Sequence, residues 1–194
     1  MNHMARSVVH TDSLRQELLA VTADLVDRDG PARVTLRDVA AAAQTSTTAV
    51  YSLFGGKSQL LTAVVDDGFR SFGDSQVAAS PGGLQGLGVA YRTWALQHPS
   101  LYRLMFGGAL AAYVDCQPTP EVAADAMEPL RDAVATAQAA GVLLKAPVDV
   151  VAVAIWGQVH GLVSLELAQV GPPDADWAAA YGAALDAVAR GWAS

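Results

Sequence analysis

The sequence predicts an all-α protein of about nine helices arranged in two units. Apolar residues recur at the spacing of a helix face along almost the whole chain, whereas the alternating pattern of strands is nearly absent. Glycines and prolines separate these segments at intervals typical of helices. With 194 residues, 52% of them hydrophobic, the chain can bury a core, which excludes disorder across most of it.

Three helices are predicted in the N-terminal segment. Apolar residues four, three and four positions apart form one face of a helix that begins near Ser13 and ends at Gly30. Thr35 is the expected N-cap of a short second helix, whose Ala42 faces the core. Ser46 caps a third helix, which ends before a pair of glycines.

The remaining helices are longer. One is predicted over 57–72, and the Ser/Gly/Pro-rich stretch Ser71–Gly83 after it is interpreted as a linker. Two helices follow on either side of a proline, and a third contains Pro129, which predicts a kink or a break into two pieces. The last two helices are expected over 148–170 and 174–192.

Charge is distributed unevenly along the chain. The 12 basic and 19 acidic side chains give a net charge of −7. Residues 1–57 hold six of each sign, so residues 58–194 hold six basic and thirteen acidic side chains. The negative charge alone argues against a nucleic acid partner, but it lies outside the N-terminal segment. This asymmetry suggests two functions in one chain.

The sequence also excludes several classes of protein. The single cysteine, Cys116, cannot form an internal disulfide, and no Cys/His group has metal-ligand spacing. No nucleophile with a base and no pair of catalytic carboxylates stands out, so we predict no enzymatic activity, cofactor or metal. The uncharged run 150–165 is shorter than the roughly 20 residues of a membrane helix, and the N-terminus lacks a secretory signal. We therefore expect a cytoplasmic protein without membrane contact.

The segment Val34–Leu61 has the pattern of a helix-turn-helix, in which the second of two short helices enters the major groove of DNA. The small residues Ala40–Ala43 suit the crossing of the two helices. Hydroxyl groups on the open face can reach bases and phosphates, and the flanking cations can clamp phosphates. The helix N-termini at Thr35 and Ser46 offer backbone N–H groups to the same phosphates. The predicted DNA-binding residues are Thr35, Arg37, Ser46, Thr47, Thr48, Tyr51, Ser52 and Lys57.

Three motifs follow one another here, at Thr35–Ala40, Val50–Phe54 and Lys57–Leu61. Their order and spacing closely resemble the DNA-binding domain of the TetR family of bacterial transcriptional regulators. The resemblance implies DNA contacts by Arg37, Thr47, Thr48, Tyr51 and Lys57. The turn between the helices departs from the family pattern, because Gln44 stands where glycine is usual. A positive φ at Gln44 would therefore be strained.

The C-terminal part carries a second resemblance. The stretch His98–Phe106, followed by Trp156–Gly161, is similar to the Trp-His-Gly (WHG) type of TetR regulatory domain. Such domains dimerise through their last two helices, here 148–170 and 174–192, and hold an effector pocket. Few charges lie near the candidate pocket, so a fairly apolar effector is expected. The candidate ligand-binding residues are Trp94, Tyr102, Met105, Phe106, Tyr113, Trp156 and His160.

Simpler interpretations stay open for these residues. An aromatic stripe usually forms core, and His160 is either a hydrogen-bonded core residue or an effector contact. Gly157 and Gly161 suit a close crossing of two helices. Arg92, Arg103 and His98 are the first candidates to bind an effector carboxylate.

We therefore expect a helix-turn-helix domain over 1–56, a connecting helix and linker over 57–80, and a ligand-binding and dimerisation domain over 81–194. The predicted function is a homodimeric transcriptional regulator on double-stranded DNA. It would be a repressor released from a palindromic operator by a small-molecule effector. The alternative is a helical small-molecule-binding protein or an enzyme without DNA binding, which salt-dependent DNA affinity would distinguish.

Overall fold

The computed structural model describes residues 2–107 and 117–193, with side chains from Thr11 onward, and within these ranges it is all-α, as predicted. Tyr113, a candidate ligand-binding residue, and Cys116, the single cysteine, lie outside the described residues. The elements are α1 (Asn2–Asp29), α2 (Leu36–Ala42), α3 (Thr47–Phe54), α4 (Lys57–Ala79), the short 3₁₀ helix η1 (Ser80–Gly82), α5 (Gly83–Gln97), α6 (Pro99–Phe106), α7 (Pro120–Asp125), α8 (Glu128–Ala139), α9 (Val148–Leu167) and α10 (Trp177–Gly191).

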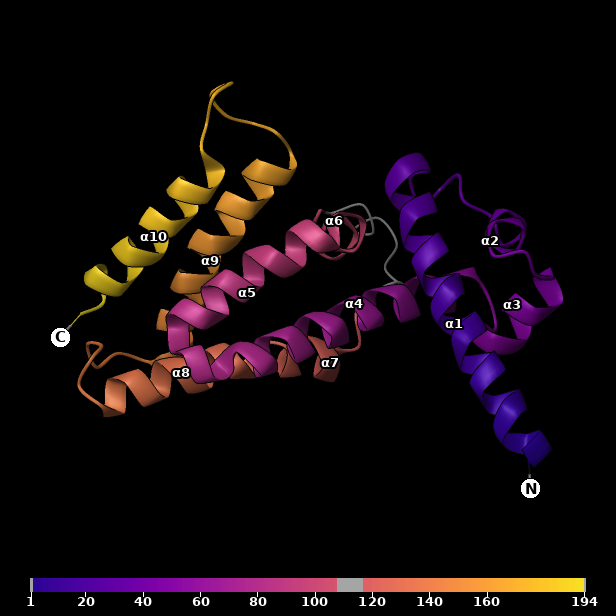
Figure 1. Cartoon of the computed structure of the whole chain (residues 1–194), viewed down its shortest axis with the longest axis horizontal. Coiled ribbons are helices and arrows are strands. Elements are labelled where there is room, and N and C mark those ends of the chain that lie inside the picture. The colour runs from indigo at the N-terminus through magenta and orange to yellow at the C-terminus, as the bar shows by residue number, and fades with distance from the viewer. Residues whose placement is uncertain (1, 108–116, 194) are drawn as a thin grey trace. The chain divides into compact units, whose positions relative to one another are not determined.

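The chain forms two compact units, and the division between them falls inside α4. The first unit comprises residues 1–70 and 100–123, and the second comprises 71–99 and 124–194. In the first unit, α2 and α3 lie beside α1 (Figure 1). Their shared core includes Leu18, Val39 and Val50.

Helix α1 begins at Asn2, so the prediction of a start near Ser13 was wrong. The capping pattern of Ser13 with Gln16 lies inside a longer helix, where side-chain capping has no role. The C-terminal prediction was right, because Gly30 follows the helix with a positive φ of 78°.

The stretch Ser71–Gly83 is not a linker, since α4 continues to Ala79 and η1 follows it. Burial of Phe72 and Gln76, four residues apart, fixes one face of this helix. Two serine hydroxyls in the stretch donate back to carbonyls of α4, that of Ser75 to the Phe72 oxygen at 2.7 Å and that of Ser80 to the Gln76 oxygen at 3.0 Å. The serines that suggested a linker are thus compatible with a helix, because their hydroxyls can donate hydrogen bonds to carbonyls of the preceding turn.

The predicted break at Pro129 is present. Helix α7 ends at Asp125 and α8 begins at Glu128, which places Pro129 in the first turn of α8, where a missing N–H costs nothing.

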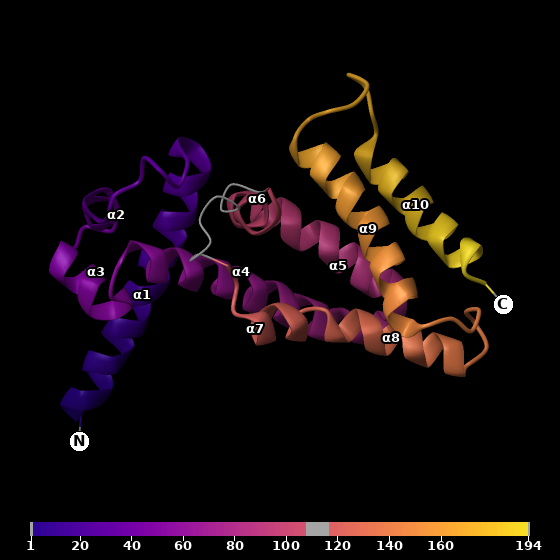
Figure 2. The same cartoon turned by 180° about the vertical axis from the view of Figure 1, so that it is seen from behind.

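In the second unit, α9 and α10 run side by side as neighbours, as both views show (Figures 1 and 2). Both helices are shorter than predicted. Helix α9 ends at Leu167, where Gln169 takes a φ of 53°, and α10 begins only at Trp177, after Asp176 caps it.

Helix α9 is apolar on nearly all sides. By length and composition it is the one described helix that could cross a membrane. Its buried positions, among them Val151, Ile155 and Val163, pack within the second unit. A core helix of a soluble protein can have the same length and composition as a membrane helix. Exposed Val150 and Val153 lie on its other side.

Candidate DNA-binding surface and ligand cavity

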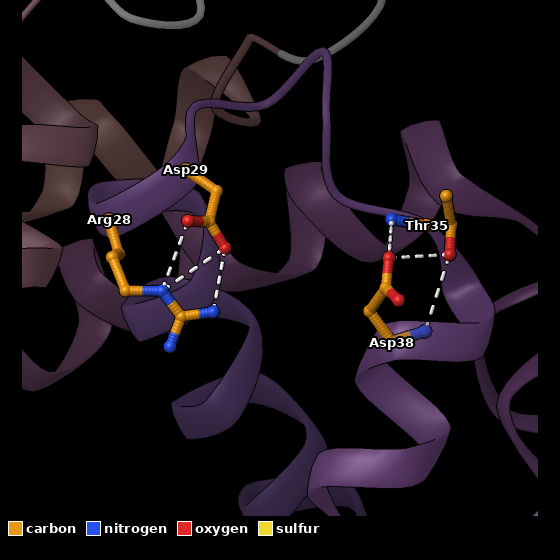
Figure 3. Close-up of polar contacts among 4 residues, drawn as sticks. All are labelled: Arg28, Asp29, Thr35 and Asp38. Atoms are coloured by element: carbon orange, nitrogen blue, oxygen red, sulfur yellow. Dashed lines mark hydrogen bonds and ion pairs between the residues drawn. The ribbon is translucent and has the colours of Figure 1, made fainter.

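The start of α2 is fixed by a reciprocal capping box, in which Thr35 is the N-cap that the sequence predicted (Figure 3). The backbone N–H of Thr35 donates to Asp38 Oδ2 at 2.9 Å, and the Asp38 N–H donates to Thr35 Oγ1 at 3.3 Å. The hydroxyl of Thr35 also donates to the same carboxylate at 2.6 Å, which lowers the pKa of Asp38. Thr35 therefore organises the N-terminal end of α2, where backbone N–H groups were predicted to reach phosphates.

The turn between α2 and α3 contains the strained residue that the sequence indicated. Gln44 has a φ of 50°, in the left-handed region that glycine adopts without cost. The backbone N–H of Thr45 returns to the Ala40 carbonyl at 2.8 Å, which closes the end of α2. Ser46 then caps α3, because its Oγ accepts the Ala49 N–H at 3.1 Å. The departure at Gln44 thus leaves the helix-turn-helix geometry intact.

The packing between the two helices agrees in part with the prediction. Ala40 and Ala43 are buried, whereas Ala41 and Ala42 are exposed, so the inward orientation predicted for Ala42 was wrong. In a helix of only seven residues, Leu36, Val39 and Ala40 already fill the inner face.

One concave region, with a volume of about 780 Å³, joins α2, α3 and the start of α4. Five predicted DNA-binding residues contribute to it, namely Thr35, Arg37, Thr47, Tyr51 and Lys57. Tyr51 is 56% exposed although it is a large ring, so its placement is not explained by the core. Ser46, Thr48 and Ser52 are also exposed, but they do not line this region.

The cations near this concave region differ in whether they form an ion pair with a carboxylate of the protein. Arg28 is bound to its neighbour Asp29, with Nη2 donating to Oδ2 at 2.6 Å (Figure 3). Within the described part of the chain, no ion pair joins Arg33, Arg37 or Lys57 to a carboxylate. These three cations are available to neutralise phosphates.

The second unit contains a separate, mainly apolar cavity with a volume of about 30 Å³. Side chains from α4, α5, α8, α9 and α10 line it, together with the two residues between α7 and α8. They include Phe72, Gln76, Tyr91, Met127 and Trp156.

Of the predicted ligand-binding residues, Trp156 lines this cavity. Trp94 is 4% exposed, and its indole Nε1 donates to Ser71 Oγ at 3.0 Å. Tyr102, Met105 and Phe106 belong to the first unit, where the rings of Tyr102 and Phe106 are 5.0 Å apart. The structure therefore does not gather these aromatic residues around the cavity.

His160 lies next to the cavity lining. Its Nδ1 is 3.0 Å from the hydroxyl of Tyr91, and its Nε2 is 3.4 Å from Ser164 Oγ. Partial burial lowers the pKa of His160, because a charged imidazolium loses hydration there. The contacts correspond to the hydrogen-bonded core histidine that the sequence analysis left open.

Two candidate carboxylate-binding residues already hold carboxylates of the protein. Arg92 donates through Nε at 2.8 Å and Nη2 at 2.6 Å to Glu166, and Arg103 donates through Nε at 2.7 Å to Asp27. Neither lines the cavity. The ring of His98 packs instead against Trp94, with centroids 5.0 Å apart.

Most residues of the cavity wall were not predicted from the sequence. Phe72 and Gln76 lay in the stretch interpreted as a linker, and a glutamine carries no signal of burial. The one available signal was the spacing of Phe69, Phe72 and Gln76, three and four residues apart, which continues the apolar face of the preceding helix.

Two short capped helices with exposed hydroxyls and available cations define the first unit as a helix-turn-helix DNA-binding domain. A family model described as "Bacterial regulatory proteins, tetR family" matches residues 18–64. A second, described as "Tetracyclin repressor-like, C-terminal domain", matches residues 84–188, more than half of the chain. The chain therefore belongs to the TetR family and is a DNA-binding transcriptional regulator. Regulators of this family bind DNA operators and small-molecule effectors.

Solved structures have the same fold. A protein of unknown function from Rhodococcus sp. RHA1 is 27% identical, with a TM-score of 0.77 over 93% of this chain and 96% of that one. A TetR family transcription regulator from Marinobacter aquaeolei VT8 is 21% identical, with a TM-score of 0.76 over 94% and 97%. The fatty acid degradation regulator FadR from Bacillus halodurans is 12% identical, with a TM-score of 0.76 over 90% and 93%. None of the curated proteins matches the chain.

Proposed function

We propose that the chain is a cytoplasmic homodimeric repressor that leaves a palindromic operator when a small, fairly apolar molecule enters the second unit. The proposal of an effector rests on the apolar cavity. This cavity lies in the second unit, whereas the DNA-binding helices α2 and α3 lie in the first. A ligand acts on DNA affinity only through its different affinity for two states of the protein.

The residues proposed to touch DNA are those of the concave region together with the exposed hydroxyls of α3. Arg37 and Lys57 would hold phosphates, while Thr47, Thr48, Tyr51 and Ser52 lie on the helix that would enter the groove. Thr35 and Ser46 are used in capping, so we assign them the role of orienting backbone N–H groups towards phosphates.

The dimer is proposed to form through α9 and α10. Exposed Val150, Val153 and Leu165 leave apolar surface on α9, and a methyl group built on Gly157 or Gly161 would meet nothing within 4 Å. A second copy of the chain would cover this surface with the same two helices, forming a four-helix bundle. A twofold axis in the protein would match a palindromic operator.

The proposal is tested by fluorescence anisotropy with DNA from upstream of the chain's own gene, at three salt concentrations, against a scrambled duplex. Tight binding that weakens steeply with salt and exceeds binding to the scrambled duplex is expected. Equal binding to both duplexes at every salt concentration would contradict an operator in that DNA. Sedimentation of the free protein should give the mass of two chains.

A further inference from the structure

We propose that the cavity of the second unit takes an uncharged, mainly aromatic molecule, and that the side-chain amide of Gln76 is the polar group that selects it. This inference rests on the proposed effector function and names the class of effector.

The cavity wall carries no charged side chain, which disfavours ionic ligands. None of the lining side chains is charged; they are Phe72, Gln76, Leu84, Leu87, Gly88, Tyr91, Ala126, Met127, Leu130, Ile155, Trp156, Val159 and Leu185. The nearby Arg92 is held by two hydrogen bonds to Glu166. A carboxylate or an ammonium group in this cavity would therefore lose its hydration without gaining a partner of opposite charge.

The wall favours rings. Phe72 and Tyr91 contact each other edge to face, with ring centroids 5.2 Å apart, and Trp156 adds an indole from α9. Edges and faces of aromatic side chains attract a further ring in offset or T-shaped geometry.

Most polar atoms of the wall are engaged with the protein itself. The Trp156 indole Nε1 donates to the hydroxyl oxygen of Tyr91 at 3.4 Å, and that hydroxyl also contacts His160 at 3.0 Å. These contacts join α5 and α9 at the side of the cavity.

Gln76 differs from those groups. Its side chain is only 5% exposed, and the hydrogen bond described for its amide is a long one, from Nε2 to Ser75 Oγ at 3.4 Å. A buried amide held by one long hydrogen bond gains free energy from a ligand that offers it a shorter one. Because an amide both donates and accepts, it suits a hydroxyl, a ketone or an amide on the ligand.

The cavity must widen to accept such a molecule. Its 30 Å³ is room for about two water molecules, far below the roughly 300 Å³ at the lower end of ligand pockets. Met127 is the most adaptable part of the wall, because its side chain is unbranched and it lies in the break between α7 and α8.

The expected preference for an uncharged ligand is tested on the full chain, without DNA, by titrating two fluorescent probes that share one ring system. N-phenyl-1-naphthylamine is uncharged, and 1-anilinonaphthalene-8-sulfonate carries a sulfonate. We expect saturable binding of the uncharged probe, one per chain, at least tenfold tighter than that of the sulfonate. Equal or tighter binding of the sulfonate, or no saturable binding of the uncharged probe, would overturn the proposal.

The site is then located with Met127→Ala, which should tighten binding of the uncharged probe severalfold by enlarging the cavity. The control is Val77→Ala, which also removes bulk from the second unit, at a side chain 63% exposed and outside the cavity wall. If both variants shift the affinity alike, the probe does not occupy this cavity.

The role of Gln76 is tested by displacing the bound probe with 2-naphthol and with naphthalene. In Gln76→Met, which keeps the length of the side chain, the preference for 2-naphthol should fall about tenfold, whereas Gln85→Leu at an exposed glutamine should leave it unchanged. An unaltered preference in the Gln76 variant would refute the assigned role. If Gln76→Met fails to fold, Gln76→Leu takes its place, and circular dichroism decides which variant is used.

These measurements separate the two proposals. Probe binding with the expected selectivity but no DNA binding would overturn the proposed repressor and leave the cavity assignment standing. Operator binding without saturable probe binding would overturn the cavity assignment and leave the regulator standing.

Discussion

The hydroxyl oxygen of Tyr91 lies 3.0 Å from Nδ1 of His160, which joins α5 to α9 inside the second unit. The indole of Trp156 donates to the same hydroxyl, so three side chains of the predicted regulatory domain form one polar cluster. Burial lowers the pKa of His160, and the neutral imidazole is the form that the folded protein favours.

We expect this cluster to make the stability of the protein depend on pH. An unfolded histidine titrates near pH 6.5, so below that value the unfolded chain binds a proton that the folded chain resists. The free energy of unfolding should therefore fall as the pH is lowered from 7.5 to 5.5, as urea denaturation would measure. His160→Gln should lose less stability over that interval than the wild type. Parallel pH profiles of the two proteins would contradict the burial of a neutral His160.

The left-handed residue between α2 and α3 gives a second prediction. Gln44→Gly should raise the free energy of unfolding by about 1 kcal/mol, because glycine adopts a φ of 50° without the strain of a side chain. Thermal denaturation measures the change. Gln85→Gly, a matched substitution inside α5, should be destabilising instead. Destabilisation by both would mean that the Gln44 side chain makes a contact worth more than the strain.

Lys57 is expected to hold a phosphate. Lys57→Ala should weaken binding to every duplex alike and reduce the slope of log K against log salt by about one. Anisotropy titrations on the operator and on a scrambled duplex measure both quantities. Lys145→Ala, at an exposed lysine of the second unit, is the control and should leave the slope unchanged. A loss confined to the operator would show that Lys57 reads bases.

The apolar face of α9 gives a prediction about assembly. Val153→Asp should convert the proposed dimer to monomers, because the charge would be buried without a partner in the interface. Val153 is 56% exposed in the single chain, so the substitution leaves the fold of each chain intact. Val142→Asp, at a residue 61% exposed outside α9 and α10, should remain dimeric in sedimentation. A dimeric Val153 variant would place the interface elsewhere.

Signals that act over a few residues were predicted well. The cap at Thr35, the break at Pro129 and the positive φ at Gln44 depend on side chains and backbone within one turn, and the structure contains all three. The DNA-binding residues could be proposed for the same reason, because they follow one another over a short segment.

Features that depend on distant partners were predicted poorly. The second half of α4 resembles a linker by composition, and it is helical because Phe72 and Gln76 are buried within the second unit. The cavity wall combines residues as far apart in the sequence as Phe72 and Leu185. No spacing along the chain indicates which aromatic residues will line the same cavity. Trp94 and Trp156 both lie on apolar helix faces in the sequence, yet the indole of Trp94 donates a hydrogen bond to Ser71, whereas Trp156 lines the cavity.

The continuity of α4 has a consequence for recombining this protein with its relatives. The division between the two units falls inside this helix, between Arg70 and Ser71. A junction placed there therefore interrupts a continuous run of backbone hydrogen bonds. A chimaera that exchanges the two units must keep helix-forming residues on both sides of this junction, and a graft with a flexible joint there would leave backbone N–H and C=O groups of α4 without partners even if both units folded.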